Sequence, residues 1–322
     1  MDTRTLPHTD LTVSRACFGT MTFGSQADAP AAARLVDCCL DRGVNFFDTA
    51  NMYNAGVAET ILGEILKGRR DRVVLASKVR FPVKGAPAEA GLSRAAMSTA
   101  IDASLRRLQT DYLDLYYLHA PDWEVPIEES LETMDALVRA GKVRYPAISN
   151  YAAWQVAEML WIGERKGYKA PHVSQPMYNL LARGIEQEYV AMCQRFGVAM
   201  VVYNPLAGGL LTGKQPRQTP LAGTRFDNNQ LYLGRYWHPA CFDAVDQLRG
   251  IAEKAGRTLV DLSLNWLLHH TATDAIILGA SKLEQLEQNL DAFERGPLLA
   301  DVTAACDGVW SELRGVTPKY NR

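Results

Sequence analysis

The sequence has no excess of charge of either sign and no long apolar run. Lysine and arginine together number 34 and aspartate and glutamate 36, so the formal net charge is −2. This balance excludes the broad basic field that attracts nucleic acid or anionic membranes. No stretch approaches the length of a membrane span, and residues 1–8 lack the apolar region of a signal peptide. We therefore expect a cytoplasmic protein with no nucleic-acid and no membrane partner.

The cysteines also lack the spacing of a known metal or redox motif. The chain has 6 cysteines, with no Cys-x-x-Cys pair and no zinc-like spacing to histidine. Most of them lie in apolar runs, where a free cysteine behaves as a small hydrophobic residue. We therefore predict no metal centre.

Short apolar segments alternate with helical patterns along the whole chain, spaced by roughly thirty residues except before the last, which is the length of one βαβ unit. The predicted strands are residues 16–19, 46–48, 73–78, 113–118, 143–149, 173–175, 199–203 and 275–278. The predicted helices are residues 31–42, 59–67, 93–108, 127–140, 154–166, 185–196, 240–255, 259–269, 281–289 and 298–314.

This alternation predicts an α/β fold, a closed (β/α)8 TIM barrel formed as a single domain over residues 1–322. Apolar strands flanked by helices form parallel sheets covered on both faces. No Gly-x-Gly-x-x-Gly follows an early strand, which disfavours an open dinucleotide-binding sheet. We also expect an N-terminal hairpin over residues 4–13, a long loop over residues 204–239 after strand seven, and a C-terminal helix. Pro146 predicts a bulge in the fifth strand.

Reactive side chains follow the ends of the predicted strands. They are Asp48, Lys78, His119, Ser149, Asn150, Gln175 and Tyr203. In a parallel barrel the carboxyl ends of the strands converge on one face, which is where active sites form. We therefore expect these residues to form one site.

Tyr53, five residues after Asp48, is the candidate proton donor. A free tyrosine has a pKa of about 10, and a nearby Lys78 cation would lower it. Asp48 would hold Lys78 in its charged form, and His119 would hydrogen-bond the substrate oxygen. Taken singly, Asp48 and Lys78 could be a structural ion pair, and His119 a satisfied core histidine. Compatible residues at successive strand ends favour a joint catalytic role.

Four short motifs resemble those of the aldo-keto reductase family, namely Asp48-Thr-Ala-x-x-Tyr53, Ser77-Lys78, Leu118-His119-Ala-Pro and Ser149-Asn150. The resemblance covers essentially the whole chain and implies the barrel fold. It also implies a catalytic tetrad of Asp48, Tyr53, Lys78 and His119, with Tyr53 as general acid and base. Hydride would come from a nicotinamide cofactor without any metal. Residues 203–214 and 279–289 are similar to the aflatoxin-aldehyde reductase branch of the family.

The expected cofactor is NADPH or NADP, and several residues are suited to bind its nicotinamide and pyrophosphate. Tyr203 could stack on the nicotinamide ring, although it could also be an aromatic residue that caps the core. The carboxamide could accept hydrogen bonds from Ser149, Asn150 and Gln175 or donate hydrogen bonds to them. Asp48 is also expected near the cofactor. The segment after Tyr203 offers backbone amides and a lysine that could bind a pyrophosphate. The candidate residues in it are Asn204, Leu206, Gly208 and Lys214.

The segment after the last strand predicts the binding of a second phosphate. Ser281 and Glu284 have the spacing of a capping box, which by itself could explain both residues. A helix N-terminus that carries Lys282 also attracts phosphate. We expect Lys282 and Arg225 to bind the ribose 2′-phosphate. Because only NADPH carries this phosphate, we predict that the protein prefers NADPH to NADH. The remaining candidates are Gly279, at the strand end, and Gln285 and Asn289, which share a helix face toward the adenosine.

The substrate pocket is predicted to be apolar, which would suit an aromatic aldehyde or ketone. The candidate wall residues are Met21, Met52, Trp123, Tyr236 and Trp237. The tail that ends at Arg322 could reach an acidic substrate. The expected partner is a small carbonyl or alcohol, and the protein is expected to be a monomer or a homodimer.

Three functions remain open at this point. The first is NADPH-dependent reduction of an aldehyde or ketone to an alcohol. The second uses the same residues in reverse, for NADP-dependent oxidation of a sugar or secondary alcohol. The third is a cofactor-binding redox sensor or channel-associated subunit with little turnover, which rests on analogy of fold alone.

Overall fold

A computed structural model describes residues 1–316 of the chain. Within this range eight parallel strands close a barrel in the order β10-β3-β4-β5-β6-β7-β8-β9. The strands are β3 (Ala16–Gly19), β4 (Phe46–Asp48), β5 (Val74–Val79), β6 (Leu113–Leu118), β7 (Val143–Ser149), β8 (Val173–Gln175), β9 (Ala199–Val202) and β10 (Ala275–Gly279). The predicted (β/α)8 barrel is confirmed.

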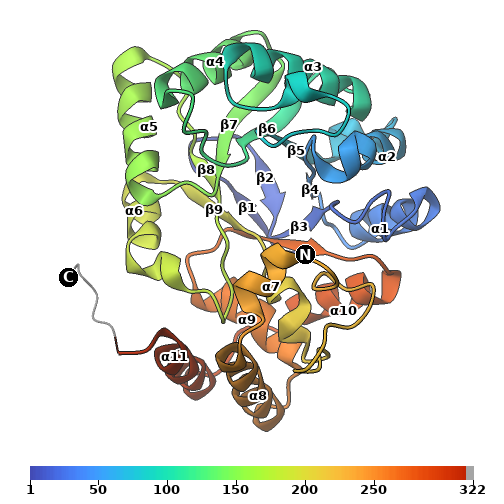
Figure 1. Ribbon diagram of the computed structural model, residues 1–322, viewed down its shortest axis with the longest axis vertical. Helices are drawn as coiled ribbons and strands as arrows, with labels where there is room; N and C mark the ends of the chain where they lie inside the picture. Colours follow the sequence, from blue (N-terminus) through green and yellow to red (C-terminus); the bar gives the residue numbers. More distant parts are fainter. Residues whose placement is uncertain (317–322) are drawn as a thin grey trace.

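Helices surround the barrel (Figure 1). They are α1 (Ala29–Asp41), α2 (Val57–Leu66), α3 (Arg94–Leu108), α4 (Ile127–Arg139), α5 (Ala153–Lys166), α6 (Tyr189–Phe196), α9 (Leu259–His270) and α10 (Leu283–Phe293). Two further helices, α8 (Pro239–Lys254) and α11 (Ala300–Arg314), pack against each other. In the part of the chain that the structure describes, no helix is long and apolar enough to cross a membrane.

Sequence patterns explain where the helices begin and what they bury. Helix α1 begins after Asp28, whose carboxylate accepts a hydrogen bond from the backbone N–H of Ala31 at 2.9 Å, and Pro30 occupies its first turn. Its buried face includes Leu35 and Val36. Burying an aliphatic side chain of this size stabilises the fold by roughly 1.5–3 kcal/mol, which fixes the helix against the barrel.

Strand β6 shows why the sequences of the barrel strands are continuous apolar runs. Tyr116 and Leu118 lie in the apolar layer between the strands and the helices, whereas Leu115 and Tyr117 lie in a second cluster inside the barrel. All four side chains are buried, because both faces of the sheet are covered. The strand therefore has no solvent face that would require polar residues.

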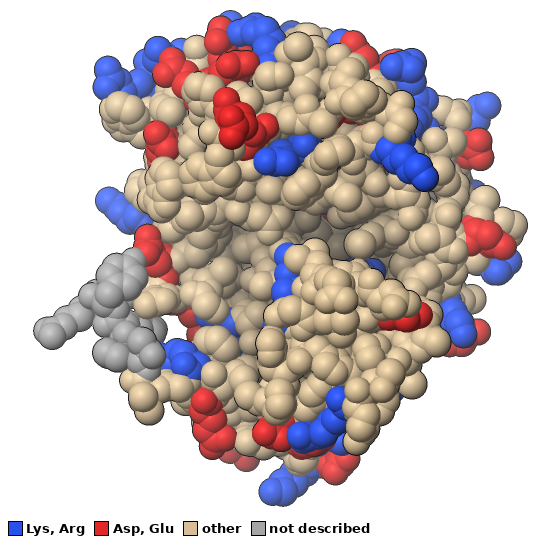
Figure 2. Space-filling view, in the orientation of Figure 1, with Lys and Arg blue, Asp and Glu red and all other residues tan. Residues whose placement is uncertain are grey.

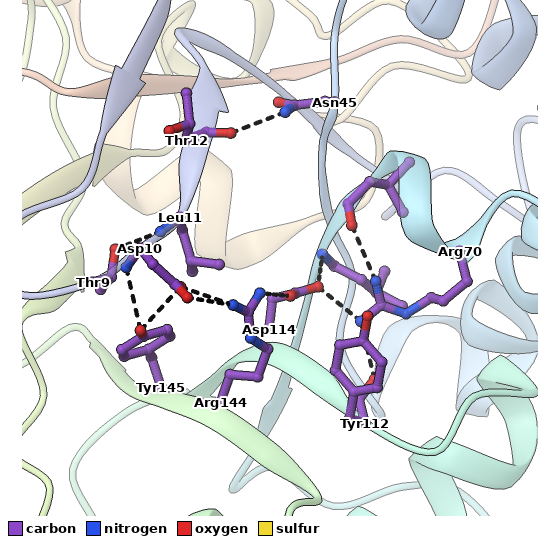
Figure 3. A network of polar contacts seen from close by, with 12 residues as sticks. Thr9, Asp10, Leu11, Thr12, Asn45, Arg70, Tyr112, Asp114, Arg144 and Tyr145 are labelled. Carbon is purple, nitrogen blue, oxygen red and sulfur yellow. Dashed lines mark hydrogen bonds and ion pairs between the residues drawn. The ribbon is translucent and has the colours of Figure 1, made fainter.

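An N-terminal hairpin, β1 (Thr3–Thr5) and β2 (Thr12–Ser14), forms as predicted and packs its apolar side chains into the cluster inside the barrel. Figure 3 shows the polar network that attaches the hairpin to the strands. Arg144 donates to Asp10 at 2.8 and 2.9 Å and to Asp114 at 2.7 Å. Arg70 also donates to Asp114 at 2.7 Å. A nearly fully buried carboxylate thus joins two arginines, and one of them holds the hairpin turn.

Two predictions about chain geometry are wrong. The register between β6 and β7 is constant from Leu113↔Val143 to Leu118↔Ile148, so Pro146 causes no bulge in this pairing. Strand β8 pairs only with Ile148 and Ser149, so the pairing on that side requires no N–H from the proline. Residues 185–196 do not form one helix, because η4 (Gly184–Gln187) is separated from α6 by Glu188, whose φ is −150°.

The long loop after β9 contains structure that the sequence did not predict. It begins with the 3₁₀ helix η5 (Ala207–Thr212) and includes the short helix α7 (Gln230–Tyr236). Asn229 caps α7 with a side-chain bond to the backbone N–H of Tyr232 at 3.4 Å. The loop is also tied to the segment after β3, because Gln26 donates to the carbonyl of Gly223 at 2.9 Å.

Candidate active site

The predicted reactive residues lie at the carboxyl ends of the barrel strands. Asp48 ends β4, Lys78 is the next-to-last residue of β5, and His119 directly follows β6. A hollow crosses the middle of the molecule in Figure 2, beside the segment that carries α7. The convergence expected of a parallel barrel is therefore present.

Lys78 is the centre of the polar contacts. Its ammonium donates to the Asp48 carboxylate, to the carbonyl of Thr49 at 2.8 Å and to the hydroxyl of Tyr53 at 3.3 Å. Gln175 donates to the other oxygen of Asp48 at 2.9 Å. Lys78 is 0% exposed and Asp48 2% exposed. A lysine ammonium has three N–H donors, and each of them meets an oxygen here, so its position is fully determined.

The pKa directions are consistent with a charged lysine. Burial alone lowers the pKa of Lys78, but the neighbouring Asp48 and Tyr53 outweigh it and raise the pKa above its ordinary value of 10.5. Burial raises the pKa of the Asp48 carboxyl, and bonds from Lys78 and Gln175 oppose that rise. Because two donors point at the Asp48 carboxylate, its ionised form is the one that the site solvates.

Tyr53 differs from the expectation. Burial raises its pKa above the ordinary value of 10.0, and the lowering by Lys78 is the smaller effect. The predicted net lowering of the pKa is therefore wrong, although Lys78 acts in the predicted direction. Desolvation penalises the phenolate more than one adjacent cation favours it. Tyr53 consequently holds its proton throughout the neutral range.

His119 is a neutral imidazole next to Tyr53. The two rings meet edge to face with centroids 6.0 Å apart, and Phe81 packs on the other side at 4.9 Å. Burial and then the charge of Lys78 lower the pKa of His119 well below 6.5. Among the residues that the structure describes, Nδ1 of His119 has no hydrogen-bond partner. Because Nδ1 is enclosed, a hydrogen bond between this ring and a ligand would use the other ring nitrogen, Nε2.

The residues predicted for the nicotinamide carboxamide are linked to one another. Tyr203 follows β9, and its hydroxyl donates to Oδ1 of Asn150 at 2.8 Å. The Asn150 amide donates to the carbonyl of His119 at 2.9 Å and to the hydroxyl of Ser149 at 3.0 Å. Ser149 in turn donates to the carbonyl of Gln175 at 2.8 Å. One chain of hydrogen bonds thus connects four strand ends.

The segment after Tyr203 turns sharply through η5. Gly208 and Gly209 have φ values of 69° and 101°, a conformation that favours glycine. Asn204 supports this turn, because its carbonyl oxygen accepts from the N–H of Gly208 at 2.6 Å and its amide donates to Tyr236 at 2.8 Å. The Asn204 side chain is therefore used within the loop. Leu206 is half-buried and Lys214 exposed.

The start of α10 corrects the predicted capping box. Lys282, not Ser281, is the N-cap, and it makes no side-chain cap. The Gln285 side chain instead accepts from the N–H of Ser281 at 3.1 Å and from its hydroxyl at 3.3 Å. Of the two residues predicted to share a helix face, Asn289 is largely buried and Gln285 is exposed. Gly279 is exposed at the end of β10.

The two cations predicted for the ribose phosphate differ in their surroundings. Lys282 is exposed, and within the described residues it has no ion-pair partner. Arg225 lies in the loop before α7, with its guanidinium 5.4 Å from the Tyr232 ring centroid and a 3.2 Å bond to the Tyr232 hydroxyl. Lys282 is therefore available to an anion, whereas Arg225 is already held by an aromatic side chain.

The candidate wall residues occupy different surroundings. Met21 is exposed and Met52 half-buried. Trp123, 75% exposed, lines a small separate cavity with Trp154 and other residues that include no member of the tetrad. The tail that ends at Arg322, predicted to reach an acidic substrate, lies outside the described residues.

Tyr236 and Trp237 mainly support the long loop. Tyr236 is 2% exposed, and its hydroxyl accepts from the amides of Asn179 and Asn204 at 3.0 and 2.8 Å. Trp237 packs against Phe226 and Phe242, with ring centroids 5.2 and 5.0 Å apart. The expectation that Tyr236 lines the pocket is wrong, because its ring and hydroxyl are enclosed by the loop.

Two residues near the site were missed from the sequence. Phe81 packs against His119, and its only sequence signal is an aromatic side chain three residues after Lys78. Arg235 on α7 hydrogen-bonds Tyr203 and opposes the rise that burial causes in the pKa of that tyrosine. Arg235 was missed because α7 itself was not predicted in a loop rich in glycine and asparagine.

A carboxylate, an ammonium, a phenol and a neutral imidazole lie together at the carboxyl end of a (β/α)8 barrel, an arrangement that can transfer a proton to or from a bound substrate. The model of the Aldo/keto reductase family matches residues 15–311, and the chain belongs to this family. The resemblance predicted from the four motifs is confirmed, and the protein is an oxidoreductase.

Several curated proteins are similar to this chain over most of its length. It is 39% identical over 323 residues to human aflatoxin B1 aldehyde reductase member 2, covering 94% of this chain and 88% of that protein. It is 36% identical over 322 residues to human aldo-keto reductase family 7 member A3, with 94% and 96% covered. A probable voltage-gated potassium channel subunit beta of Arabidopsis thaliana is 34% identical over 309 residues, with 94% of each chain covered.

Proposed function

We propose that this protein reduces an aldehyde or ketone to an alcohol with NADPH, with Tyr53 as the proton donor. The observation that carries the proposal is the contact between the buried Lys78 ammonium and the Tyr53 hydroxyl, 3.3 Å apart, with Asp48 on the other side of the lysine. Carbonyl reduction is the chemistry named for the aldehyde reductases to which the chain is similar.

The four residues divide the work of proton transfer. Tyr53 holds its proton at neutral pH because burial raises its pKa, and it donates that proton to the carbonyl oxygen as negative charge develops there. The phenolate left on Tyr53 is stabilised by Lys78, whose charge Asp48 maintains. His119 is neutral and hydrogen-bonds the same substrate oxygen. Water then returns a proton to Tyr53.

The residues around the tetrad fit a nicotinamide cofactor. When bound, such a cofactor supplies the hydride that reaches the carbonyl carbon. The half-exposed ring of Tyr203 offers a stacking surface, and its hydroxyl is held by Asn150. An amide oxygen accepts two hydrogen bonds, so Oδ1 of Asn150 keeps one lone pair for a carboxamide N–H. Ser149 and Gln175 are the other residues that we assign to the carboxamide.

The phosphate groups have two candidate sites. The turn at Leu206 and Gly208 comes shortly before the exposed Lys214, and we assign this segment to the pyrophosphate. Lys282 is an exposed cation at the N-terminus of α10, where the helix dipole also favours an anion. We assign Lys282 to the ribose 2′-phosphate, with Arg225 and Gln285 as secondary contacts. This assignment makes NADPH the preferred cofactor over NADH.

The test of the function is a panel of carbonyl substrates followed through NADPH consumption, with the wild-type protein and Tyr53→Phe side by side. We expect turnover with aldehydes or ketones, and its loss in the variant. The same panel run with NADP and alcohols or sugars measures the reverse reaction, which the tetrad serves equally well. NADPH binding without turnover in either direction would contradict the proposal.

That last outcome would favour a second candidate, a cofactor-binding subunit with little turnover. The observation in its favour is the similarity to a protein named as a probable potassium channel subunit beta. A binding subunit does not require Lys78 to contact the hydroxyl of Tyr53, so the contact favours catalysis.

A further inference from the structure

Three consecutive left-handed residues follow Tyr53. Asn54, Ala55 and Gly56 have φ values of 49°, 56° and 88° within η1 (Tyr53–Gly56) and at the cap of α2. This backbone conformation is unstrained for glycine and tolerated by asparagine, but a Cβ makes it unfavourable for alanine. Such strain persists only where the surrounding structure holds it. The turn that carries Tyr53 is therefore held by outside contacts.

The carboxamide of Asn54 provides contacts on one side of the turn. Its amide nitrogen lies 2.6 Å from the carbonyl of Phe23, 3.2 Å from the carbonyl of Met21 and 3.3 Å from the hydroxyl of Ser25. All three acceptors belong to the segment that follows β3. The Asn54 side chain thus ties the residue after Tyr53 to a neighbouring strand end.

Helix α2 holds the other side of the turn. Its buried Glu59 accepts from the Ser77 hydroxyl at 2.5 Å and from Arg107 at 2.7 Å. Ser77 is adjacent to Lys78 in β5, so α2 is fixed to the strand that carries the lysine. A Cβ on Gly56 would lie 2.8 Å from the Arg107 side chain, which shows how closely the turn is packed.

We propose that Asn54 is a positioning residue for Tyr53. Its carboxamide holds the left-handed turn against the β3 segment, and the turn keeps the Tyr53 hydroxyl within hydrogen-bond distance of Lys78. The inference rests on the proposed role of Tyr53 as proton donor. Without the Asn54 bonds, the turn is held only from the side of α2, the left-handed backbone at Ala55 relaxes, and the phenol moves away from the ammonium.

The variant Asn54→Gly distinguishes the effect of the side chain from the effect of the backbone conformation. Glycine adopts the left-handed conformation freely, so this variant keeps the permitted backbone and removes only the hydrogen-bond donors. Asn54→Asp is the companion variant, since aspartate also tolerates this conformation but its carboxylate cannot donate to the carbonyls of Phe23 and Met21.

Both variants are expected to lower kcat by roughly tenfold to a hundredfold, the cost of an ångström-scale misplacement of a catalytic group. KM for NADPH should stay at the wild-type value. Lys78 lowers the pKa of Tyr53, so losing the contact raises that pKa and moves the alkaline limb of the kcat profile to higher pH. A crystal structure of Asn54→Gly should show the Tyr53 hydroxyl beyond hydrogen-bond distance of Lys78.

His8→Gly is the matched control, because His8 also has a left-handed backbone, with φ of 58°, but lies in the turn of the N-terminal hairpin. It should leave kcat and the pH profile unchanged. Wild-type kcat and an unmoved alkaline limb in Asn54→Gly would overturn the inference, even if the variant melts at a lower temperature. If the wild-type protein has no turnover, the proposed function fails separately. The crystal structure of Asn54→Gly then tests the positioning role by itself. A Tyr53 hydroxyl that stays in its wild-type position would overturn that role.

Discussion

The ammonium of Lys78 lies 3.3 Å from the hydroxyl of Tyr53, although the two residues are 25 positions apart and belong to different elements. The lysine directs its other donors to Asp48 and to the carbonyl of Thr49. It is therefore held in one position, with its charge beside the phenol. This contact links the stability of the buried site to the proton chemistry proposed for it.

Removing the phenolic hydroxyl should abolish most turnover. We expect Tyr53→Phe to lower kcat by about 10²–10⁴-fold, the usual contribution of a general acid. NADPH affinity, measured by fluorescence titration, should not change, because the lost atom contacts Lys78 and the substrate. Tyr168→Phe removes a hydroxyl outside the site and serves as the control. Undiminished reduction by Tyr53→Phe would refute the proton-donor role.

Lys78→Met should destabilise the fold by about 3–5 kcal/mol, because it leaves the Asp48 carboxylate buried without its cation. In this variant the pKa of Asp48 is raised by burial with no lysine to oppose it. A raised folded-state pKa means that stability is lost as pH increases, so the destabilisation should grow from acidic to neutral pH.

The double variant Asp48→Asn, Lys78→Met removes both charges. It should recover most of the unfolding free energy in urea titrations while kcat stays low. Equal stability of Lys78→Met and the wild-type protein would show that the pair is not desolvated as described. Recovery of kcat in the double variant would remove the catalytic role of the lysine.

The pH dependence of kcat for carbonyl reduction should show no ionisation of His119. Burial and Lys78 lower the pKa of His119 well below 6.5, so the ring stays neutral and kcat should be flat between about pH 6 and about pH 9. Reduction needs the protonated phenol, and burial raises the pKa of Tyr53 above 10.0, so kcat should fall only at higher pH. Steady-state rates at saturating substrate measure this; an ionisation near 6.5 that disappears in His119→Gln would contradict it.

Lys282→Ala should weaken the discrimination between NADPH and NADH. We expect KM for NADPH to rise by about tenfold, equivalent to one charge-assisted hydrogen bond, with little effect on KM for NADH. Lys254→Ala removes an exposed lysine at the end of α8 and controls for net charge. A similar increase for both cofactors would exclude the assignment to the 2′-phosphate.

The hairpin network can be tested independently of the active site. Arg144→Ala removes the bonds to Asp10 and one of the two arginines on buried Asp114, and it should cost about 1–3 kcal/mol of unfolding free energy. Lys142→Ala breaks an exposed pair with Asp102 and should cost about 0–1 kcal/mol. Neither should change kcat. Equal stabilities of the two variants would show that the buried carboxylate does not depend on Arg144.

Local patterns were sufficient to predict most of the fold. Continuous apolar strands such as β6 and amphipathic helices such as α1 follow from hydrophobic periodicity, which depends on neighbours close in the chain. Helix α7 and the break at Glu188 were not predicted, because short segments are decided by contacts with distant residues. The same is true of Pro146, whose missing donor causes no bulge because β8 is too short to pair with it.

The sequence by itself determined the barrel, the family and the identity of the residues at the strand ends. Spacing shows that Asp48, Lys78 and His119 each end or follow a strand, and the parallel topology then brings them together. Only the tertiary structure decided how they interact. The pKa of Tyr53 rises because the effect of desolvation is larger than that of Lys78. At the start of α10, the predicted capping box is replaced by hydrogen bonds from Ser281 to the Gln285 side chain. Burial and hydrogen-bond geometry depend on the whole enclosure of a side chain, which spacing along the chain does not describe.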